Sequence, residues 1–197
     1  MTEEEITLIK LAQRGDVRAF GDLAANYDAR VMNLAISLLG SSEDAQDVYQ
    51  EVFIKVYKCL KGYRFQSDFF TWLYRITVNT CLSYRKSRQR KRALIPSSIE
   101  DNPEIADSLP DCETASPDDE VIAEEMSGLM RRAVDDLPPK QRAVVILRHY
   151  QQMKIREIAE ILGLNEGTVK GYLFRALKSL KKRFEPYYRM GEMTNGM

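Results

Sequence analysis

The stretch from Lys61 to Arg92 reads KGYRFQSDFFTWLYRITVNTCLSYRKSRQRKR. Aromatic residues gather in its first half and basic residues at its end, and no Pro or Gly occurs from Asp68 until Pro96. The absence of helix breakers predicts one helix of several turns. Rings that stack on unpaired bases, next to cations that bind phosphates, suit single-stranded DNA.

Two stripes run along this predicted helix at spacings of three and four residues. The apolar stripe has the spacing of a core-facing side, and it contains Phe69, Trp72, Leu73, Ile76 and Thr80. The other stripe is polar and basic, and it contains Arg75, Asn79, Ser83, Lys86 and Arg90. The polar stripe is either a surface that holds an anion or a solvated helix end that the helix dipole favours. Tyr63 and Phe65 fit neither stripe, which keeps a functional interpretation of their loop open.

The chain has 197 residues and a formal net charge of zero, but the charges are segregated. Residues 1–87 carry eleven bases and eleven acids, and residues 88–92 add four bases. Residues 93–120 carry nine acids and no base, whereas residues 138–184 carry eleven bases against three acids. This pattern predicts two modules that can bind polyanions, joined by a segment that cannot.

Several classes of protein are disfavoured by composition. No apolar run is long enough to span a membrane and the N-terminus is acidic, so we expect a cytoplasmic protein without membrane insertion. Cys59, Cys81 and Cys112 lack metal-ligand spacing, and His149 is the single histidine. We therefore expect no catalytic residues, no metal and no cofactor, and the chain is not predicted to be an enzyme.

The fold class we expect is all-α, with two small helical domains joined by an acidic flexible linker. The predicted segments are a first domain at 1–92, the linker at 93–120, a helix-turn-helix domain at 121–186 and a tail at 187–197. The linker has four prolines among Ser, Asp and Glu, a composition that cannot form a core. It is either a passive tether or, because of its acidity, a mimic of nucleic acid inside a basic channel.

Two further helices are expected in the first domain, at about 18–39 and 43–60. The second contains DAQDVYQEVFIKVYKCL, in which Ala45, Val48, Val52 and Val56 form the buried side. Its other face is acidic and rich in amides, and it contains Asp47, Gln50, Glu51 and Ile54. This face is either solvated or binds a partner helix that carries complementary bases.

The second domain begins with an apolar stripe at helical spacing, which Pro138 and Pro139 end. The stripe contains Val121, Ile122, Met126, Leu129, Met130, Ala133 and Leu137. We expect a helix at about 140–150 next, and then a helix-turn-helix. In that motif Gly163 permits a positive φ in the turn, and Asn165 caps the second helix.

The second helix of the motif has an inward face and an outward face. The inward face is apolar and contains Val169, Leu173, Ala176, Leu177 and Leu180. Hydrogen-bonding groups on the outward face cluster at the N-terminal half, where a recognition helix meets base edges. The outward residues include Thr168, Lys170, Gly171, Phe174, Arg175 and Lys178. A helical hairpin without a DNA role is the alternative.

Four motifs in order give the chain a resemblance to a family. They are DAQDVYQEVF (44–53), YRFQSDFFTWLYRITVN (63–79), LPPKQRAVVILRHY (137–150) and REIAEILGLNEGTVK (156–170). Over about residues 20–180 the chain resembles a bacterial sigma factor of the extracytoplasmic-function (ECF) group of the sigma-70 family. The resemblance implies a protein that binds core RNA polymerase, directs it to specific promoters and assists DNA melting, in a stress or envelope response.

The resemblance also implies partners and site residues. Asp47, Gln50 and Glu51 would bind the β′ coiled coil of core RNA polymerase, whose β subunit is a further expected partner, as is an anti-sigma factor. The residues that would bind the minus-ten element of promoter DNA are Tyr63, Arg64, Phe65, Ser67, Phe69, Arg75, Asn79 and Lys86. Those that would bind the minus-thirty-five element are Thr168, Lys170, Gly171, Tyr172, Phe174, Arg175 and Lys178. The linker is similar to one that threads the RNA channel of the polymerase.

The chain departs from the family pattern at three places. Family members commonly have Ser-Tyr at Lys154-Ile155, often Gly-Asp or Gly-Glu at Phe65-Gln66, and commonly Ser-Arg at Gly171-Tyr172. The last change removes a cation and a hydroxyl from the DNA side, so the promoter sequence does not transfer from the family. Two rival hypotheses are a polymerase-independent helix-turn-helix regulator, which would be expected to dimerise on paired half-sites, and a sigma-like adaptor without promoter activity.

Overall fold

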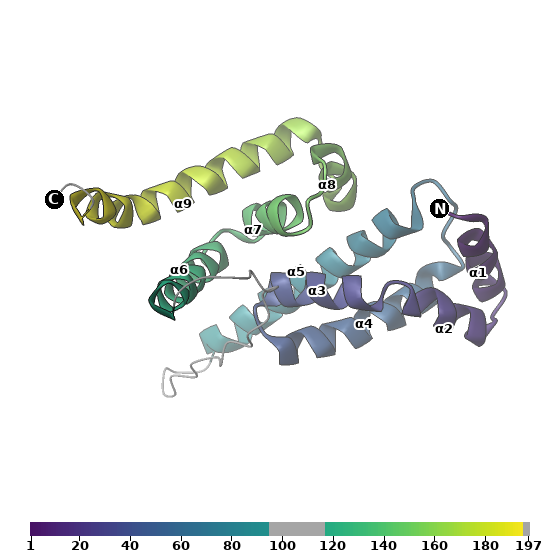
Figure 1. Ribbon diagram of the computed structural model, residues 1–197. Helices are drawn as coiled ribbons and strands as arrows, with labels where there is room; N and C mark the ends of the chain where they lie inside the picture. Colours follow the sequence, from purple (N-terminus) through teal and green to yellow (C-terminus); the bar gives the residue numbers. More distant parts are fainter. Residues whose placement is uncertain (95–116, 195–197) are drawn as a thin grey trace. The chain divides into compact units, whose positions relative to one another are not determined.

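The computed structural model describes residues 1–94 and 117–194 (Figure 1). Every regular element in these two ranges is a helix, which confirms the predicted all-α class. Most of the expected linker, residues 95–116, lies outside the described residues, and so does Cys112. Packing divides the described chain into one unit of residues 1–94 with 156–164 and another of residues 117–155 with 165–194.

The first unit is built from helices with well-defined starts. Side chains of Thr2, Asp16 and Ser41 accept hydrogen bonds from the first-turn amides of α1, α2 and α4. Gly40 ends α3 in the left-handed conformation, with φ +73°. The helices are α1 (Glu3–Gln13), α2 (Val17–Ala25), α3 (Asp28–Leu39), α4 (Ser42–Leu60) and α5 (Phe69–Leu94).

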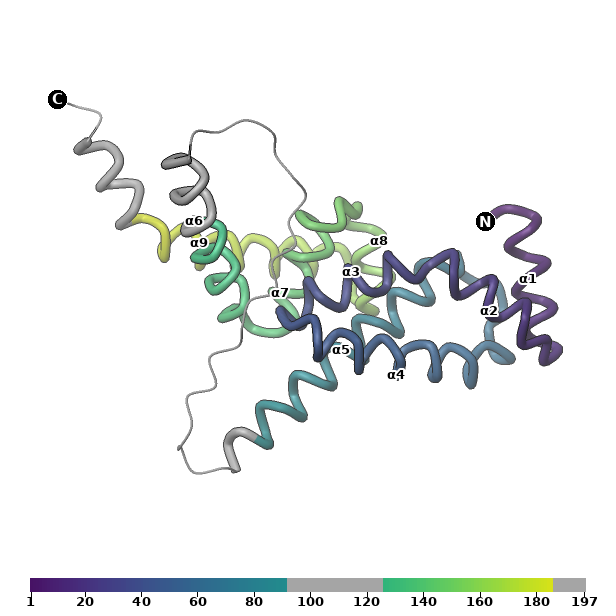
Figure 2. Tube along the Cα trace, turned by 60° about the horizontal axis from the view of Figure 1, so that its bottom comes forward, coloured from purple at the N-terminus to yellow at the C-terminus, as the bar shows by residue number. Residues whose placement is uncertain are grey.

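The core of the first unit lies where α3, α4 and α5 pack against one another. Figure 2 shows the three helices in this unit, with α5 running obliquely to α3 and α4. α1 packs mainly on α2. The buried side of α4 is the predicted one, because Ala45, Val48, Val52 and Val56 are at most 1% exposed. Asp47, Gln50, Glu51 and Ile54 are exposed on its other side, as expected.

α5 shows the predicted two-sided pattern. Phe69, Leu73 and Thr80 are buried and Trp72 and Ile76 are half-buried, whereas the whole polar stripe is exposed. The polar stripe contains Arg75, Asn79, Ser83, Lys86 and Arg90. The core side is wider than predicted, because it also contains Tyr74, Thr77, Val78 and Cys81.

The prediction of a single helix at 18–39 is wrong, because the helix is interrupted between Ala25 and Asp28. Tyr27 leaves the helical conformation with φ −121°. Its hydroxyl donates a hydrogen bond to Glu5 of α1, and its ring centroid lies 5.4 Å from that of Phe69. These tertiary contacts, rather than a Gly or Pro, accompany the break.

The second unit contains α6 (Pro117–Asp135), α7 (Pro139–Val145) and α9 (Glu166–Thr194), with α7 packed on α9. α6 begins inside the stretch expected to be linker.

The helix predicted at 140–150 is only partly α-helical, because Ile146–Tyr150 form a π-helical turn, η1. In this turn the Gln151 amide donates a hydrogen bond to the Ile146 carbonyl. Buried Arg142 pairs with Asp135. α8 (Ile155–Leu162) is joined to α9 by a short turn.

The packing of α5 predicts a clear contrast between two substitutions. Leu73→Ala removes a side chain that is 0% exposed, so the free energy of unfolding should fall by about 2–5 kcal/mol. Ile54→Ala, at a position that is 54% exposed, should change it by at most about 0.5 kcal/mol. Urea denaturation followed by fluorescence of Trp72, the one tryptophan of the chain, measures the first unit. Equal losses for the two variants would contradict this core assignment.

Candidate nucleic-acid and partner interfaces

The loop between α4 and α5, residues 61–68, has a fixed backbone. The Tyr63 amide donates to the Leu60 carbonyl at 3.0 Å, and the Tyr63 hydroxyl donates to the Ser67 carbonyl at 2.6 Å. Phe65 lies between these two bonds with φ +57°, in the left-handed region that bulky residues rarely adopt. The loop therefore holds a strained conformation at its tip.

Four aromatic rings surround the start of α5, and their exposure differs. The Tyr63 ring lies 4.8 Å from Phe65, 5.7 Å from Phe69 and 5.1 Å from Trp72, measured between centroids. Tyr63 is 5% exposed and Phe69 1%, whereas Phe65 is 36% exposed. Of Tyr63, Phe65 and Phe69, the three aromatic residues predicted to bind DNA, only Phe65 is exposed in this conformation.

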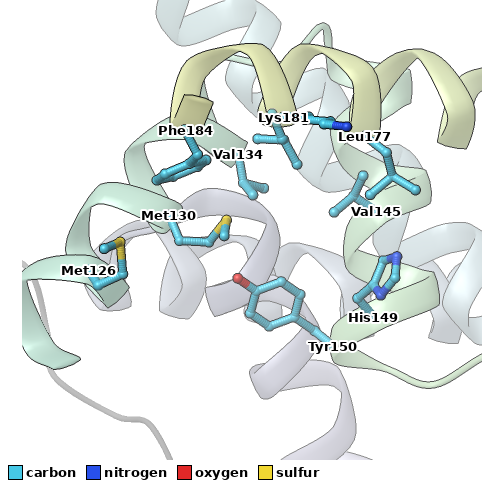
Figure 3. Close-up of a pocket in the computed structure, with 10 residues that line it drawn as sticks. Met126, Met130, Val134, Val145, His149, Tyr150, Leu177, Lys181 and Phe184 are labelled. Carbon is cyan, nitrogen blue, oxygen red and sulfur yellow. The ribbon is translucent and has the colours of Figure 1, made fainter. Parts of the chain in front are cut away.

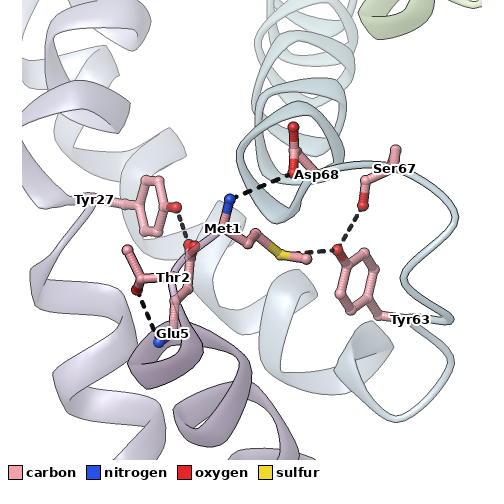
Figure 4. Close-up of polar contacts among 7 residues, drawn as sticks. All are labelled: Met1, Thr2, Glu5, Tyr27, Tyr63, Ser67 and Asp68. Atoms are coloured by element: carbon pink, nitrogen blue, oxygen red, sulfur yellow. Dashed lines mark hydrogen bonds and ion pairs between the residues drawn. The ribbon is translucent and has the colours of Figure 1, made fainter.

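Tyr63 remains a neutral hydrogen-bond donor. Burial raises the pKa of its phenol to about 12, and the nearby carboxylates of Asp68 and Glu5 act in the same direction. Figure 4 shows Tyr63 facing Met1 and Ser67, with Asp68 at the end of the loop. Tyr63 and Phe69 thus support the loop from inside.

The polar groups predicted around the loop face outward. Arg64, Arg75, Asn79 and Lys86 are exposed and Ser67 is half-buried. Within the described part of the chain, Arg64, Arg75 and Lys86 form no ion pair with an acid, so their charge is available to phosphates.

The basic end of α5 is held to α4 by one carboxylate. Asp44, which is 9% exposed, accepts a hydrogen bond from the Tyr84 hydroxyl at 2.8 Å and pairs with Arg88. Arg85 donates to the Leu38 carbonyl at 3.1 Å. Arg85 and Arg88 therefore link α5 to its neighbouring helices, although Arg88, like Lys86, is exposed.

The outward face of α4 combines charge with apolar surface. The Glu51 carboxylate lies 2.6 Å from the Lys55 ammonium, one helical turn away. Asp47 and Gln50 are exposed beside it, and Ile54 is 54% exposed. An exposed isoleucine among acidic and amide groups suits a protein partner that offers both bases and an apolar contact.

The turn of the helix-turn-helix has the predicted geometry. Gly163 has φ +63°, and the Asn165 side chain accepts a hydrogen bond from the Thr168 amide at 2.7 Å. Val169, Ala176 and Leu180 are buried as predicted. Leu177 is 44% exposed, so its predicted place in the core is wrong.

The N-terminal half of α9 presents a mixed polar and aromatic surface. Lys170, Phe174, Arg175 and Lys178 are exposed and Thr168, Gly171 and Tyr172 are half-buried. Phe174 is 68% exposed. The Arg175 guanidinium stacks over the Tyr172 ring at 5.0 Å, and its Nε donates to the Gly171 carbonyl at 3.2 Å. Arg175 is thus held along the helix.

An apolar groove of about 860 Å³ lies within the second unit, and the sequence analysis did not identify it. Figure 3 shows its walls, formed by α6, the end of α7 with η1, and the middle of α9. Met126 and Met130, expected to be part of an apolar stripe, are 42% and 39% exposed along it. The two methionines are four residues apart on one face of α6, which was the available signal for this wall of the groove. Methionine-lined grooves adapt to apolar partner helices.

Two family models match the chain, Sigma-70 region 2 over residues 23–91 and Sigma-70, region 4 over residues 127–180. The ECF RNA polymerase sigma-E factor of Escherichia coli K12 is 35% identical over 187 residues, 92% of this chain and 95% of that protein. The chain belongs to the sigma-70 family, in its ECF group. The RNA polymerase sigma-H factor of Pseudomonas aeruginosa is 32% identical over 189 residues, 95% of this chain and 97% of that protein.

Solved structures show the same fold. CnrH, in complex with the cytosolic domain of CnrY, matches with a TM-score of 0.64 and 22% identity, over 93% of this chain and 99% of that chain. The sigma factor RpoE from Bartonella quintana, in complex with the anti-sigma factor NepR, matches with a TM-score of 0.60 and 21% identity. The match covers 86% of this chain and 98% of that chain.

Membership of this family identifies the chain as a sigma factor, a transcription-initiation factor that is not an enzyme. In residues 1–94 and 117–194, no helix is long and apolar enough to cross a bilayer. The same residues contain no cluster of three or more His, Cys, Asp or Glu side chains that could hold a metal ion.

Proposed function

We propose that this sigma factor binds core RNA polymerase through the outward face of α4 and opens promoter DNA with the 61–68 loop and α5. The observation that carries the proposal is the side of α5 on which Arg75, Asn79 and Lys86 are exposed, with the exposed Phe65 ring in the preceding loop. A ring for stacking, an amide for base edges and cations for phosphates are what an unpaired strand requires.

In this proposal α9 reads the minus-thirty-five element. Thr168, Lys170, Gly171, Tyr172, Phe174, Arg175 and Lys178 lie in its first half, where base edges in a major groove can be reached. Phe174 can contact a thymine methyl group, because it is apolar and exposed.

The apolar groove of the second unit is proposed to hold an apolar helical segment of the polymerase β subunit. Its lining from α6, η1 and α9 is apolar, with Lys181 and His149 also at its wall. An anti-sigma factor that occupies the same groove would compete with the polymerase. RpoE was solved in complex with the anti-sigma factor NepR, and CnrH in complex with the cytosolic domain of CnrY. These complexes support control of this sigma factor by a bound protein.

Run-off transcription with purified core polymerase on a genomic fragment library tests the function as a whole. Transcripts that start only when this sigma factor is added would identify its promoters. Failure to produce any such transcript, with core binding retained, would favour a sigma-like adaptor without promoter activity.

Charge reversal on α4 tests the polymerase interface. Glu51→Lys, alone or with Asp47→Lys, should weaken core binding by on the order of tenfold or more, because complementary charges become like charges. The readout is fluorescence anisotropy of labelled sigma factor titrated with core polymerase, with helicity checked by circular dichroism. Glu4→Lys on the exposed side of α1 is the matched control. Equal affinities for all variants would exclude this face.

Two lysines of α9 should separate sequence reading from phosphate binding. Lys170 lies in the first half of α9, which is proposed to face base edges, so Lys170→Ala should change the sequence preference. Lys182→Ala should instead lower the affinity for all DNA sequences and reduce the slope of log affinity against log salt concentration by about one. Competitive selection from a randomised minus-thirty-five library by holoenzyme, at several salt concentrations, measures both effects. Loss of affinity in both variants without a change of preference would mean that α9 is not the reader.

Asn79→Ala should spare core binding and closed-complex formation but reduce DNA opening. Its exposed amide would be lost as a partner for an unpaired base, whose capture offsets an unstacking cost of a few kcal/mol. Permanganate footprinting of promoter thymines gives the readout, and a pre-melted bubble template should restore most transcription. Asn33→Ala, at an exposed asparagine of α3, is the control. Wild-type reactivity of the Asn79 variant on intact duplex would assign Asn79 a structural role.

A further inference from the structure

We propose that α1 positions the 61–68 loop for DNA capture and that Gln13 is the positioning residue through which it acts. This inference rests on the proposed function, because it concerns the same loop. It adds a residue 50 positions away from Tyr63 that lies outside the surfaces proposed above to contact DNA and polymerase.

Gln13, the last residue of α1, is hydrogen-bonded to the first and the last residue of the turn Leu60–Tyr63, which follows α4. Its side-chain nitrogen donates to the Leu60 carbonyl at 3.0 Å and to the Tyr63 carbonyl at 2.8 Å. A primary amide has two N–H groups, so one nitrogen satisfies both carbonyls at once. The bonds are partly buried. The Leu60 carbonyl also accepts from the Tyr63 amide, so removal of the Gln13 donor is most unfavourable at the Tyr63 carbonyl.

The backbone just beyond these bonds is strained. Phe65 follows Tyr63 by two residues and has φ +57°, although a residue with a bulky side chain avoids this region. Such a conformation persists only where the surroundings over-determine it. The Tyr63 hydroxyl fixes the far side of Phe65 by donating to Ser67, and Gln13 fixes the near side from outside the loop.

Contacts from Met1, which precedes α1, also reach this loop, as Figure 4 shows. The Met1 sulfur lies 3.7 Å from the Tyr63 hydroxyl, and the Met1 amino group lies 3.8 Å from the Asp68 carboxylate. The Met1 sulfur is a weak acceptor, and the ion pair is long and involves the exposed Asp68. Both contacts therefore contribute little to the stability of the loop. Glu5 accepts from Tyr27, whose ring packs on Phe69. Gln13 is the strongest direct link from α1 to the loop.

The consequence concerns the exposed Phe65 ring. If the Gln13 bonds are removed, the strain at Phe65 favours other loop conformations, and the fraction of molecules with the ring ready to stack falls. Affinity for an unpaired base falls with that fraction. The outward face of α4 is unaffected, because Gln13 bonds the far end of that helix, at Leu60.

Gln13→Met tests the inference, since methionine has a similar length but no donor. Gln13→Glu is a second variant, which replaces the donor nitrogen by an acceptor oxygen. Lys10→Met, an exposed position one turn earlier in α1, is the matched control. Circular dichroism and core-binding titrations establish that each variant is folded and forms holoenzyme.

The measurement is fluorescence anisotropy of holoenzyme with a labelled single-stranded oligonucleotide that carries the minus-ten sequence found by run-off transcription. The same oligonucleotide is also tested with an abasic site at each position in turn. For the wild type and Lys10→Met, an abasic site at the captured position should weaken binding. For Gln13→Met and Gln13→Glu, binding of the intact oligonucleotide should be about tenfold weaker, and that abasic site should cause no further loss.

Each other outcome overturns a specific statement. Gln13 variants that bind the intact oligonucleotide as tightly as the wild type, and lose as much affinity when the abasic site is introduced, would show that α1 does not position the loop. Variants that lose core binding and oligonucleotide binding equally would show a general structural role for Gln13. A wild type that is insensitive to every abasic site would remove base capture itself from the proposed function, and the role of Gln13 with it.

Discussion

The first unit depends on one constraint, which is that α5 is buried along one side and exposed along the other. Leu73 and Val78 are 0% exposed against α3 and α4, and this packing sets the rotation of the helix about its axis. Arg75 and Asn79 are then directed to solvent. A rotation that buried Arg75 would leave a charge in the core, at a cost no gain in packing could offset. Stability and the placement of the DNA-facing groups therefore have the same physical origin.

The same packing links the two proposed surfaces of the first unit. Lys55 of α4 lies 2.6 Å from Glu51 and also donates to the Thr80 hydroxyl of α5 at 3.3 Å. An exposed ion pair contributes little by itself, so the rigid connection comes from the buried contacts beneath it. A partner bound to the outward face of α4 would thus fix the direction of α5 without a conformational change.

Periodic features of the fold could be predicted from sequence. The two sides of α4 and α5 follow from residue spacing, because a helix turns by a constant angle per residue. Gly163 and Asn165 fix the helix-turn-helix turn by local chemistry, and the structure has the predicted φ and cap there. The break at Tyr27 and the exposure of Leu177 could not be predicted, since each is decided by which distant element packs on the residue.

The candidate site shows the same limit at smaller scale. Asp47, Glu51, Arg75 and Asn79 could be placed on exposed faces by counting, because exposure follows the helical period. The left-handed conformation of Phe65 has no local signal, since the residue is neither Gly nor Asn. It is fixed by bonds at its two sides, and one of these bonds comes from Gln13, 50 residues earlier than Tyr63. Local patterns find the groups that contact a ligand, whereas the residues that hold those groups in place become visible only when distant segments are seen together.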